Sequence, residues 1–246
     1  MLFRKKKTPK CAAVIVAAGA STRMGRDKIM AQLCGKPVIW YAIRAFDLNP
    51  CVEEIVVVTR QALIEPIAQL CADHGFSKVK AVVVGGENRT QSVLIGVEAA
   101  GSRHGLVAVH DGARPLVSQR VITQTVTLAS KTGAAAPAIP VVDTIKVAES
   151  GTVTDTPDRS KLFAVQTPQV FDADLLRAAL TDVLEKDAAV TDDCAAVERL
   201  GMRVLLTEGA PENLKITKPM DLQIAQLYLE KGGSECESDT AMTSTD

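Results

Sequence analysis

The chain has 246 residues, a formal net charge of −1 and 47% hydrophobic residues, which suits one large α/β domain with a substantial core. The near-neutral charge argues against nucleic-acid binding, which favours a basic domain, so the positive charge that meets an anionic ligand must be local. The 6 cysteines form no CxxC pair and there are only 3 histidines, which argues against a zinc site and a disulfide scaffold.

The two ends of the chain differ in composition from the rest. Residues 1–10 form a basic tail, and the apolar run that follows imitates a signal peptide. We reject that interpretation, because the run has the length of a strand and leads directly into a polar loop that contains glycine. Residues 232–246 are rich in Ser, Thr and acidic groups and are expected to be disordered. No apolar stretch approaches the ~20 residues of a membrane span, so we expect one cytoplasmic domain over residues 11–231 and no membrane partner.

Apolar runs alternate with helical patterns over the first part of the domain. Strands are predicted at residues 12–18, 54–59, 80–84, 106–110 and 134–139. Helices are predicted at residues 37–46, 63–74, 91–100 and 121–129, from apolar positions three and four apart and from flanking Pro and Gly. Strands separated by helices of this length predict an α/β fold with a mainly parallel twisted sheet, whose ligands bind at the carboxyl ends of the strands.

The alternation breaks at residues 142–170. Residues 144–147 and 152–154 have the pattern of two strands around a turn at residues 149–151, which predicts a protruding β-hairpin. It is either an ordinary surface hairpin or a dimerisation arm. Beyond it we expect a helix capped by Asp172, a short helix near Thr191, a strand at residues 202–206 and a last helix that opens at Pro219.

The loop after the first strand, AAGASTRMGRDK (residues 17–28), carries small residues together with the cations Arg23 and Lys28. Small residues let the backbone approach a ligand, and free N–H groups can cradle phosphates. The loop matches neither a Walker A motif nor GxGxxG, so a P-loop hydrolase and a dinucleotide oxidoreductase lose support. The alternative is an ordinary strand-to-helix turn with solvent-facing cations.

Three later segments carry further polar groups. Residues 85–92 offer exposed backbone and polar side chains suited to a base edge, or form only the capped start of a helix. Asp111 ends the fourth strand, where it could hold Mg²⁺ or a sugar hydroxyl, or pair with Arg114. Lys215 lies in an apolar, strand-like run, where it is an edge-strand guard or a ligand contact.

Seven segments occur in a fixed order along the chain: AAGASTRMGRDK, GGENRTQSV, VHDGARP, VVDTIK, QTPQVF, TDD and ENLKITKP. In this order they resemble the 2-C-methyl-D-erythritol 4-phosphate cytidylyltransferases, over residues 14 to about 229. The resemblance implies transfer of CMP from CTP to methylerythritol phosphate with release of pyrophosphate. It also implies a Rossmann-like nucleotidyltransferase fold, dependence on Mg²⁺ and a homodimer joined by an arm at residues 143–160.

The resemblance further implies a role for each matching residue. Arg23 and Lys28 would stabilise the transition state, while Arg159 and Lys215 would position the acceptor phosphate, Arg159 from across the dimer. Nucleotide binding falls on Ala17, Ala18, Gly19, Ala20, Gly86, Glu87, Ser92 and Gly112. The acceptor side falls on Asp111, Arg114, Thr144, Thr167 and Thr191, with Asp111 also the metal-side carboxylate.

Two departures and two alternatives accompany this hypothesis. Ser21 stands where family members often have a second Gly, and Ile29 stands where Gln is familiar. Ser21 makes the loop less permissive than a glycine would. Gln is not an obvious catalytic group, so we expect retained activity with a different local contact at Ile29. A related cytidylyltransferase that acts on ribitol 5-phosphate would share most of these motifs. A nucleotide-binding protein without turnover is disfavoured, because the cations and Asp111 are all present.

Overall fold

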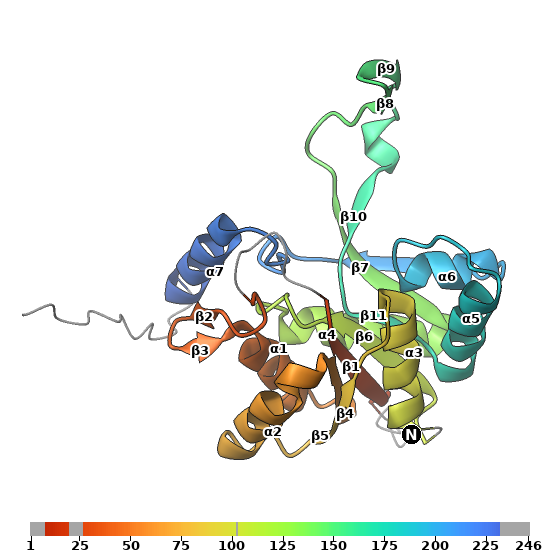
Figure 1. The fold of residues 1–246 in the computed structure, drawn as a ribbon. Helices are drawn as coiled ribbons and strands as arrows, with labels where there is room; N and C mark the ends of the chain where they lie inside the picture. The colour runs from red at the N-terminus through yellow and green to blue at the C-terminus, as the bar shows by residue number, and fades with distance from the viewer. Residues whose placement is uncertain (1–7, 20–26, 102, 232–246) are drawn as a thin grey trace, which may run out of the picture.

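The structure is a computed structural model that describes residues 8–19, 27–101 and 103–231. Its centre is a sheet in the order β10-β7-β11-β6-β1-β4-β5, with β12 paired to β7 (Figure 1). The strands β1 (Cys11–Ala17), β4 (Val52–Thr59), β5 (Val79–Val84) and β6 (Leu106–Asp111) are parallel to their neighbours within this group. The mainly parallel α/β sheet predicted from the sequence is therefore confirmed.

Helices cover both faces of the sheet. On one face lie α1 (Val38–Asp47), α2 (Ile64–Asp73) with the short η2 (Gln61–Leu63), and α4 (Gln119–Thr132). On the other lie α3 (Arg89–Ala100), α5 (Ala173–Glu185) and α6 (Asp193–Arg199). Along β1 the side chains alternate between the two cores, with Ile15 in the first and Val14 in the second, and both are fully buried. Burial on both faces is why this strand is apolar throughout.

The later strands complete the sheet in a way that the sequence did not predict. β7 (Ala134–Pro140) lies beyond β11 (Gln169–Asp172), which inserts antiparallel between β6 and β7. β10 (Phe163–Val165) pairs antiparallel with the outer side of β7. The late strand expected at residues 202–206 is β12 (Leu205–Glu208), three residues further along. The run around Lys215 is not a strand, so the edge-strand interpretation of this lysine is wrong. Isolated contacts anchor the run instead, such as the bond from Ile216 N to Ala113 O at 2.8 Å.

A hairpin arm projects far from the sheet (Figure 1). It contains β8 (Val147–Glu149), β9 (Thr152–Asp155) and the 3₁₀ turn η3 (Arg159–Lys161). The predicted hairpin is present, but its first strand begins at Val147 instead of residue 144. The arm carries exposed apolar side chains, with Val142 82% and Val153 55% exposed. Exposed apolar side chains of this kind are stabilised when another surface covers them, which is typical of an interaction site.

A third, smaller core lies beside the sheet. The last helix α7 (Pro219–Lys231) packs through Leu222 and Ala225 against the small hairpin of β2 (Gln32–Leu33) and β3 (Lys36–Pro37). Ile216 is part of the same core, so its burial holds the neighbouring Lys215 segment in place. None of the helices in the described ranges has the length and apolar character needed to cross a bilayer.

Candidate active site

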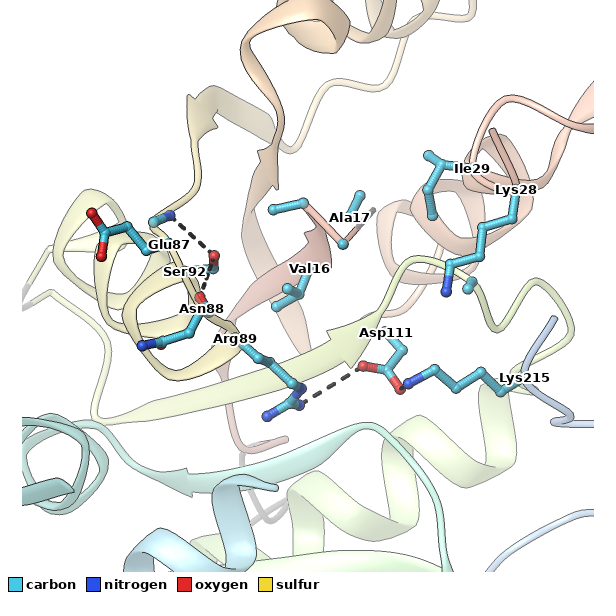
Figure 2. Close-up of a pocket in the computed structure, with 14 residues that line it drawn as sticks. Val16, Ala17, Lys28, Ile29, Glu87, Asn88, Arg89, Ser92, Asp111 and Lys215 are labelled. Atoms are coloured by element: carbon cyan, nitrogen blue, oxygen red, sulfur yellow. Dashed lines mark hydrogen bonds and ion pairs between the residues drawn. The ribbon is translucent and has the colours of Figure 1, made fainter. Parts of the chain in front are cut away.

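A pocket of about 320 Å³ opens where β1, β5 and β6 end, at the edge of the sheet where parallel α/β proteins bind ligands (Figure 2). Four segments far apart in sequence line it. Its lining comprises Val16, Ala17, Ala18, Gly19, Lys28, Ile29, Gly86, Glu87, Asn88, Arg89, Ser92, Asp111, Ala113 and Lys215. The structure thus brings together, from separate motifs, residues that the family resemblance assigned to the nucleotide and residues that it assigned to the acceptor.

The loop after β1 lies very close to the loop after β5. A Cβ added at Gly85 would lie 2.6 Å from the Cβ of Ala18 and 2.8 Å from the Ser92 hydroxyl, so neither Gly85 nor the small Ala18 can grow without a shift. Close backbone approach of this kind leaves room for a ligand against main-chain N–H groups. Two predicted residues of the first loop, Ala20 and Arg23, lie outside the described residues.

Internal hydrogen bonds shape the loop that precedes α3. The Gly86 N–H donates to the Ser92 hydroxyl at 3.1 Å, and that hydroxyl donates to the Asn88 carbonyl at 2.8 Å. The Asn88 side chain caps α3 by accepting from Gln91 N, and the Glu87 N–H donates to the Gln91 side chain. Ser92 therefore holds the loop in shape and leaves Gly86 and Glu87 at the pocket surface.

Asp111 is the carboxylate at the centre of the site (Figure 2). Its Oδ2 lies 2.8 Å from Lys215 Nζ and 3.7 Å from Arg114 Nε, and its Oδ1 lies 3.8 Å from Arg89 Nη2. Burial raises the pKa of Asp111, but the attraction of Lys215, Arg89 and Arg114 outweighs it and holds the pKa at about 2. The group is therefore ionised at neutral pH and orients the Lys215 ammonium.

Buried groups beneath the pocket fix Asp111 from behind. The Asp111 N–H donates to the Thr167 hydroxyl at 3.1 Å, and this hydroxyl also bonds His110 Nδ1 at 3.0 Å. His110 is fully buried, and burial lowers its pKa to about 4, so it is a neutral support. Arg114 donates to the carbonyl of Asn213, two residues before Lys215, at 2.6 Å. In this structure Thr167 and Arg114 support the pocket from outside its lining.

Gly112 also lies behind the lining. Its N–H donates to the Val16 carbonyl at 2.9 Å, and a Cβ there would lie 2.7 Å from Ile39 Cδ1. The residue therefore keeps β1 and β6 in register at the site.

Lys28 extends into the pocket from the far end of the first loop (Figure 2). Asp27 fixes the chain at this point, because its Oδ1 accepts from Ile29 N at 3.0 Å and its Oδ2 pairs with Arg60, which follows β4. Ile29, where the family resemblance led us to expect Gln, is only 2% exposed and gives the pocket an apolar floor.

Three further predicted residues also lie outside the pocket lining. Thr144 and Arg159 are exposed on the arm, where Arg159 Nη1 donates to the Val142 carbonyl at 2.8 Å. Thr191 is exposed just before α6. Within one chain the arm projects away from the sheet (Figure 1), and the bond from Arg159 joins it to the nearby backbone of Val142 and not to a pocket residue.

One charged pair at the site, Arg89 with Asp193, was not expected from the sequence. Arg89 Nη1 and Nη2 lie 2.9 and 2.8 Å from the two carboxylate oxygens of Asp193, whose side chain is 1% exposed. The available signal was weak, because it consisted of an arginine in GGENRTQSV and the second Asp in TDD, which lie 104 positions apart in the sequence.

The arrangement suits an anionic ligand. Lys28, Arg89 and Lys215 bring positive charge to one cavity, while Asp111 is the lining carboxylate that faces two of them. Across the described ranges, no three His, Cys, Asp or Glu side chains gather as a metal cage. Mg²⁺, however, is commonly held by one or two carboxylates together with substrate phosphates, and the ionised Asp111 fits that pattern.

Comparison with protein families gives one clear match. The model described as "IspD: 2-C-methyl-D-erythritol 4-phosphate cytidylyltransferase" matches residues 11–231. A protein of that name from Caldanaerobacter subterraneus is 44% identical over 223 residues, covering 89% of this chain and 98% of its own. Another from Desulforamulus reducens is 43% identical over 230 residues, covering 92% and 98%.

Solved structures agree with the sequence comparisons. The 2-C-methyl-D-erythritol 4-phosphate cytidylyltransferase of Thermus thermophilus superposes with a TM-score of 0.74 at 32% identity, covering 90% of this chain and 99% of that one. The 4-diphosphocytidyl-2C-methyl-D-erythritol synthase of Anaerococcus prevotii gives a TM-score of 0.81 at 27% identity, covering 91% and 97%.

Proposed function

Because the chain belongs to the 2-C-methyl-D-erythritol 4-phosphate cytidylyltransferase family, it is a nucleotidyltransferase that moves CMP from CTP to methylerythritol phosphate in isoprenoid precursor synthesis, and we propose that the Lys28–Asp111–Lys215 pocket performs this transfer. The observation that carries the assignment to this pocket is the convergence of Lys28 and Lys215 on one cavity around an ionised Asp111. Ribitol 5-phosphate is not favoured as the acceptor. The relatives that match this chain over nearly their whole length are named as methylerythritol phosphate cytidylyltransferases.

The chemistry needs positioned charge and no side-chain nucleophile. An oxygen of the acceptor phosphate forms a bond to the α-phosphorus of CTP, and the bond from that phosphorus to the bridging oxygen of the β-phosphate breaks. Pyrophosphate leaves with the electron pair. Two anionic reactants must meet and charge spreads over the equatorial oxygens, so preorganised cations supply most of the catalysis.

We assign the groups of this chain to that reaction as follows. Residues 17–20 and the loop at Gly86 and Glu87 bind the nucleotide, with Ser92 holding the loop in shape. Lys28, with Arg23, stabilises charge at the α-phosphoryl group. Lys215, oriented by Asp111, positions the acceptor phosphate.

A divalent cation is part of the proposal. Asp111 would hold Mg²⁺ together with the phosphates of CTP, and the ion would neutralise charge on those phosphates as the bond to the leaving group breaks. The low pKa of Asp111 supports this, because the carboxylate is available as an anion throughout the physiological range.

We also propose that the active unit is a homodimer in the cytoplasm, where CTP is available. The exposed apolar side chains of the arm support a partner there, and a second copy would bring Thr144 and Arg159 to a pocket that they do not reach in their own chain. Thr191, before α6, completes the acceptor side.

The acceptor is tested by release of pyrophosphate. Purified protein with CTP and Mg²⁺ is incubated with methylerythritol phosphate or with ribitol 5-phosphate, and the product is identified by mass. We expect faster release with methylerythritol phosphate and a CDP-methylerythritol product. Faster release with ribitol 5-phosphate would refute the assignment.

A further inference from the structure

Arg89 begins α3, directly after the nucleotide-side loop, yet its side chain reaches across the pocket to residues on the acceptor side (Figure 2). We propose that Arg89 is a positioning residue that couples the nucleotide side to the acceptor side by holding Asp193 and Asp111 at the same time. This inference rests on the proposed function, because it assigns Asp111 and Thr191 to the acceptor.

The Arg89 guanidinium is already bound to a protein group. Both of its terminal nitrogens bond the carboxylate of Asp193, at 2.9 and 2.8 Å, in the two-point geometry that a planar guanidinium favours. Burial raises the pKa of Asp193 and Arg89 opposes that rise. A buried carboxylate without its cation is costly, so the pair fixes the guanidinium in place and it is not available as a mobile ligand for the triphosphate.

Asp193 lies two residues after Thr191, which the proposed function assigns to the acceptor side. It is the first residue of α6, whose cap is Asp192, and Thr191 comes immediately before. Gln169 of β11 also holds this helix start, donating to Asp192 Oδ2 at 2.7 Å and accepting from the Asp193 and Cys194 N–H groups at 3.1 Å. Arg89 therefore links the N-terminus of α3, which follows the nucleotide-side loop, to the firmly held N-terminus of α6 beside Thr191.

Arg89 also contributes to the orientation of Asp111. Arg89 lies 3.8 Å from one carboxylate oxygen and Lys215 lies 2.8 Å from the other, so two cations on opposite oxygens orient the group. Without Arg89, Asp111 would turn toward Lys215 and Arg114, and the lysine that positions the acceptor phosphate would move with it. The effect of losing Arg89 should therefore fall on the acceptor more than on CTP.

The experiment compares Arg89→Lys and Asp193→Asn with the neutral pair Arg89→Gln/Asp193→Asn, which leaves no unpaired buried charge. The matched control is Arg177→Lys, an arginine that also pairs with two carboxylates, Glu98 and Asp174, but on the outer surface. CTP affinity is measured by titration without acceptor, KM and kcat by pyrophosphate release, and folding by thermal unfolding.

We expect the acceptor KM to rise about 10- to 100-fold in each site variant, the range typical when a group that orients a binding residue is lost. CTP affinity should stay within about threefold, and the double variant should be no worse than the single ones, because the two residues act as a unit. The control should resemble wild type.

Two results would overturn the inference. A lower melting temperature with the kinetic constants of the control would make the pair a structural brace only. A loss of CTP affinity as large as the loss in acceptor KM would make Arg89 a nucleotide contact. Wild-type turnover is measured separately, so failure of the wild type with methylerythritol phosphate would count against the proposed function and not against the coupling.

Discussion

Replacing Asp111 with Asn tests how the charges at the site are balanced. The exchange keeps the shape of the side chain but leaves Lys215, Arg89 and Arg114 facing a neutral amide. The pKa of Asp111 falls from 3.8 to about 2 because these cations outweigh the opposing effect of burial. At about 1.4 kcal/mol per unit, the depression corresponds to roughly 2 kcal/mol of folding stability at neutral pH. We therefore expect the variant to lose about that amount, together with most of its turnover.

The sign of the pH dependence follows from the direction of the shift. A carboxylate whose folded pKa is depressed adds stability above its unfolded pKa, 3.8, and loses it as the pH falls toward 2. The difference in unfolding free energy between wild type and Asp111→Asn should therefore be constant from pH 7 to pH 5 and should shrink by pH 3. Urea unfolding followed by circular dichroism at these pH values measures it.

A surface pair provides the control for this measurement. Asp174 pairs with Arg177 at 2.6 Å, but its side chain is 91% exposed, so Asp174→Asn should change stability little at any pH. If Asp111→Asn were as stable as wild type at pH 7, or if the difference did not depend on pH, the account of Asp111 as a carboxylate stabilised by three cations would be wrong.

Two further predictions concern catalysis. Lys28→Ala should lower turnover by about 10²–10³-fold while CTP affinity changes little, because a preorganised cation stabilises the transition state more than bound CTP. Lys28→Arg should restore little of the lost turnover. A near-normal kcat in the alanine variant would remove Lys28 from the mechanism. Mixing inactive Arg159→Ala subunits with inactive Lys28→Ala subunits should restore part of the activity, because a mixed dimer holds one pocket with both residues intact; no recovery despite measured subunit exchange would mean that Arg159 acts within its own chain.

The parallel part of the sheet was predictable because its signals are local. The buried run at β1 and the apolar stripe of α1 each follow from neighbouring residues, and the glycine after α2 marks its end. β10 and β11 were missed, because strands of three and four residues carry too little periodicity to stand out from a loop. The run around Lys215 was mistaken for a strand because it is apolar, whereas Ile216 is apolar in order to enter the core under α7.

The sequence by itself predicted most of the segments that line the pocket, since polar loops follow buried strands and parallel strands bring those loops to one edge of the sheet. Only the tertiary structure decided what each residue does there. Ser92 and Thr167 proved to hold backbone in place, and Arg89 proved to bind Asp193, 104 residues away. The contact between Arg89 and Asp193 depends on the N-termini of α3 and α6 being brought together by the pairing of β6 with β11. A local sequence pattern cannot indicate the partner of a buried charge that lies so far away in the chain.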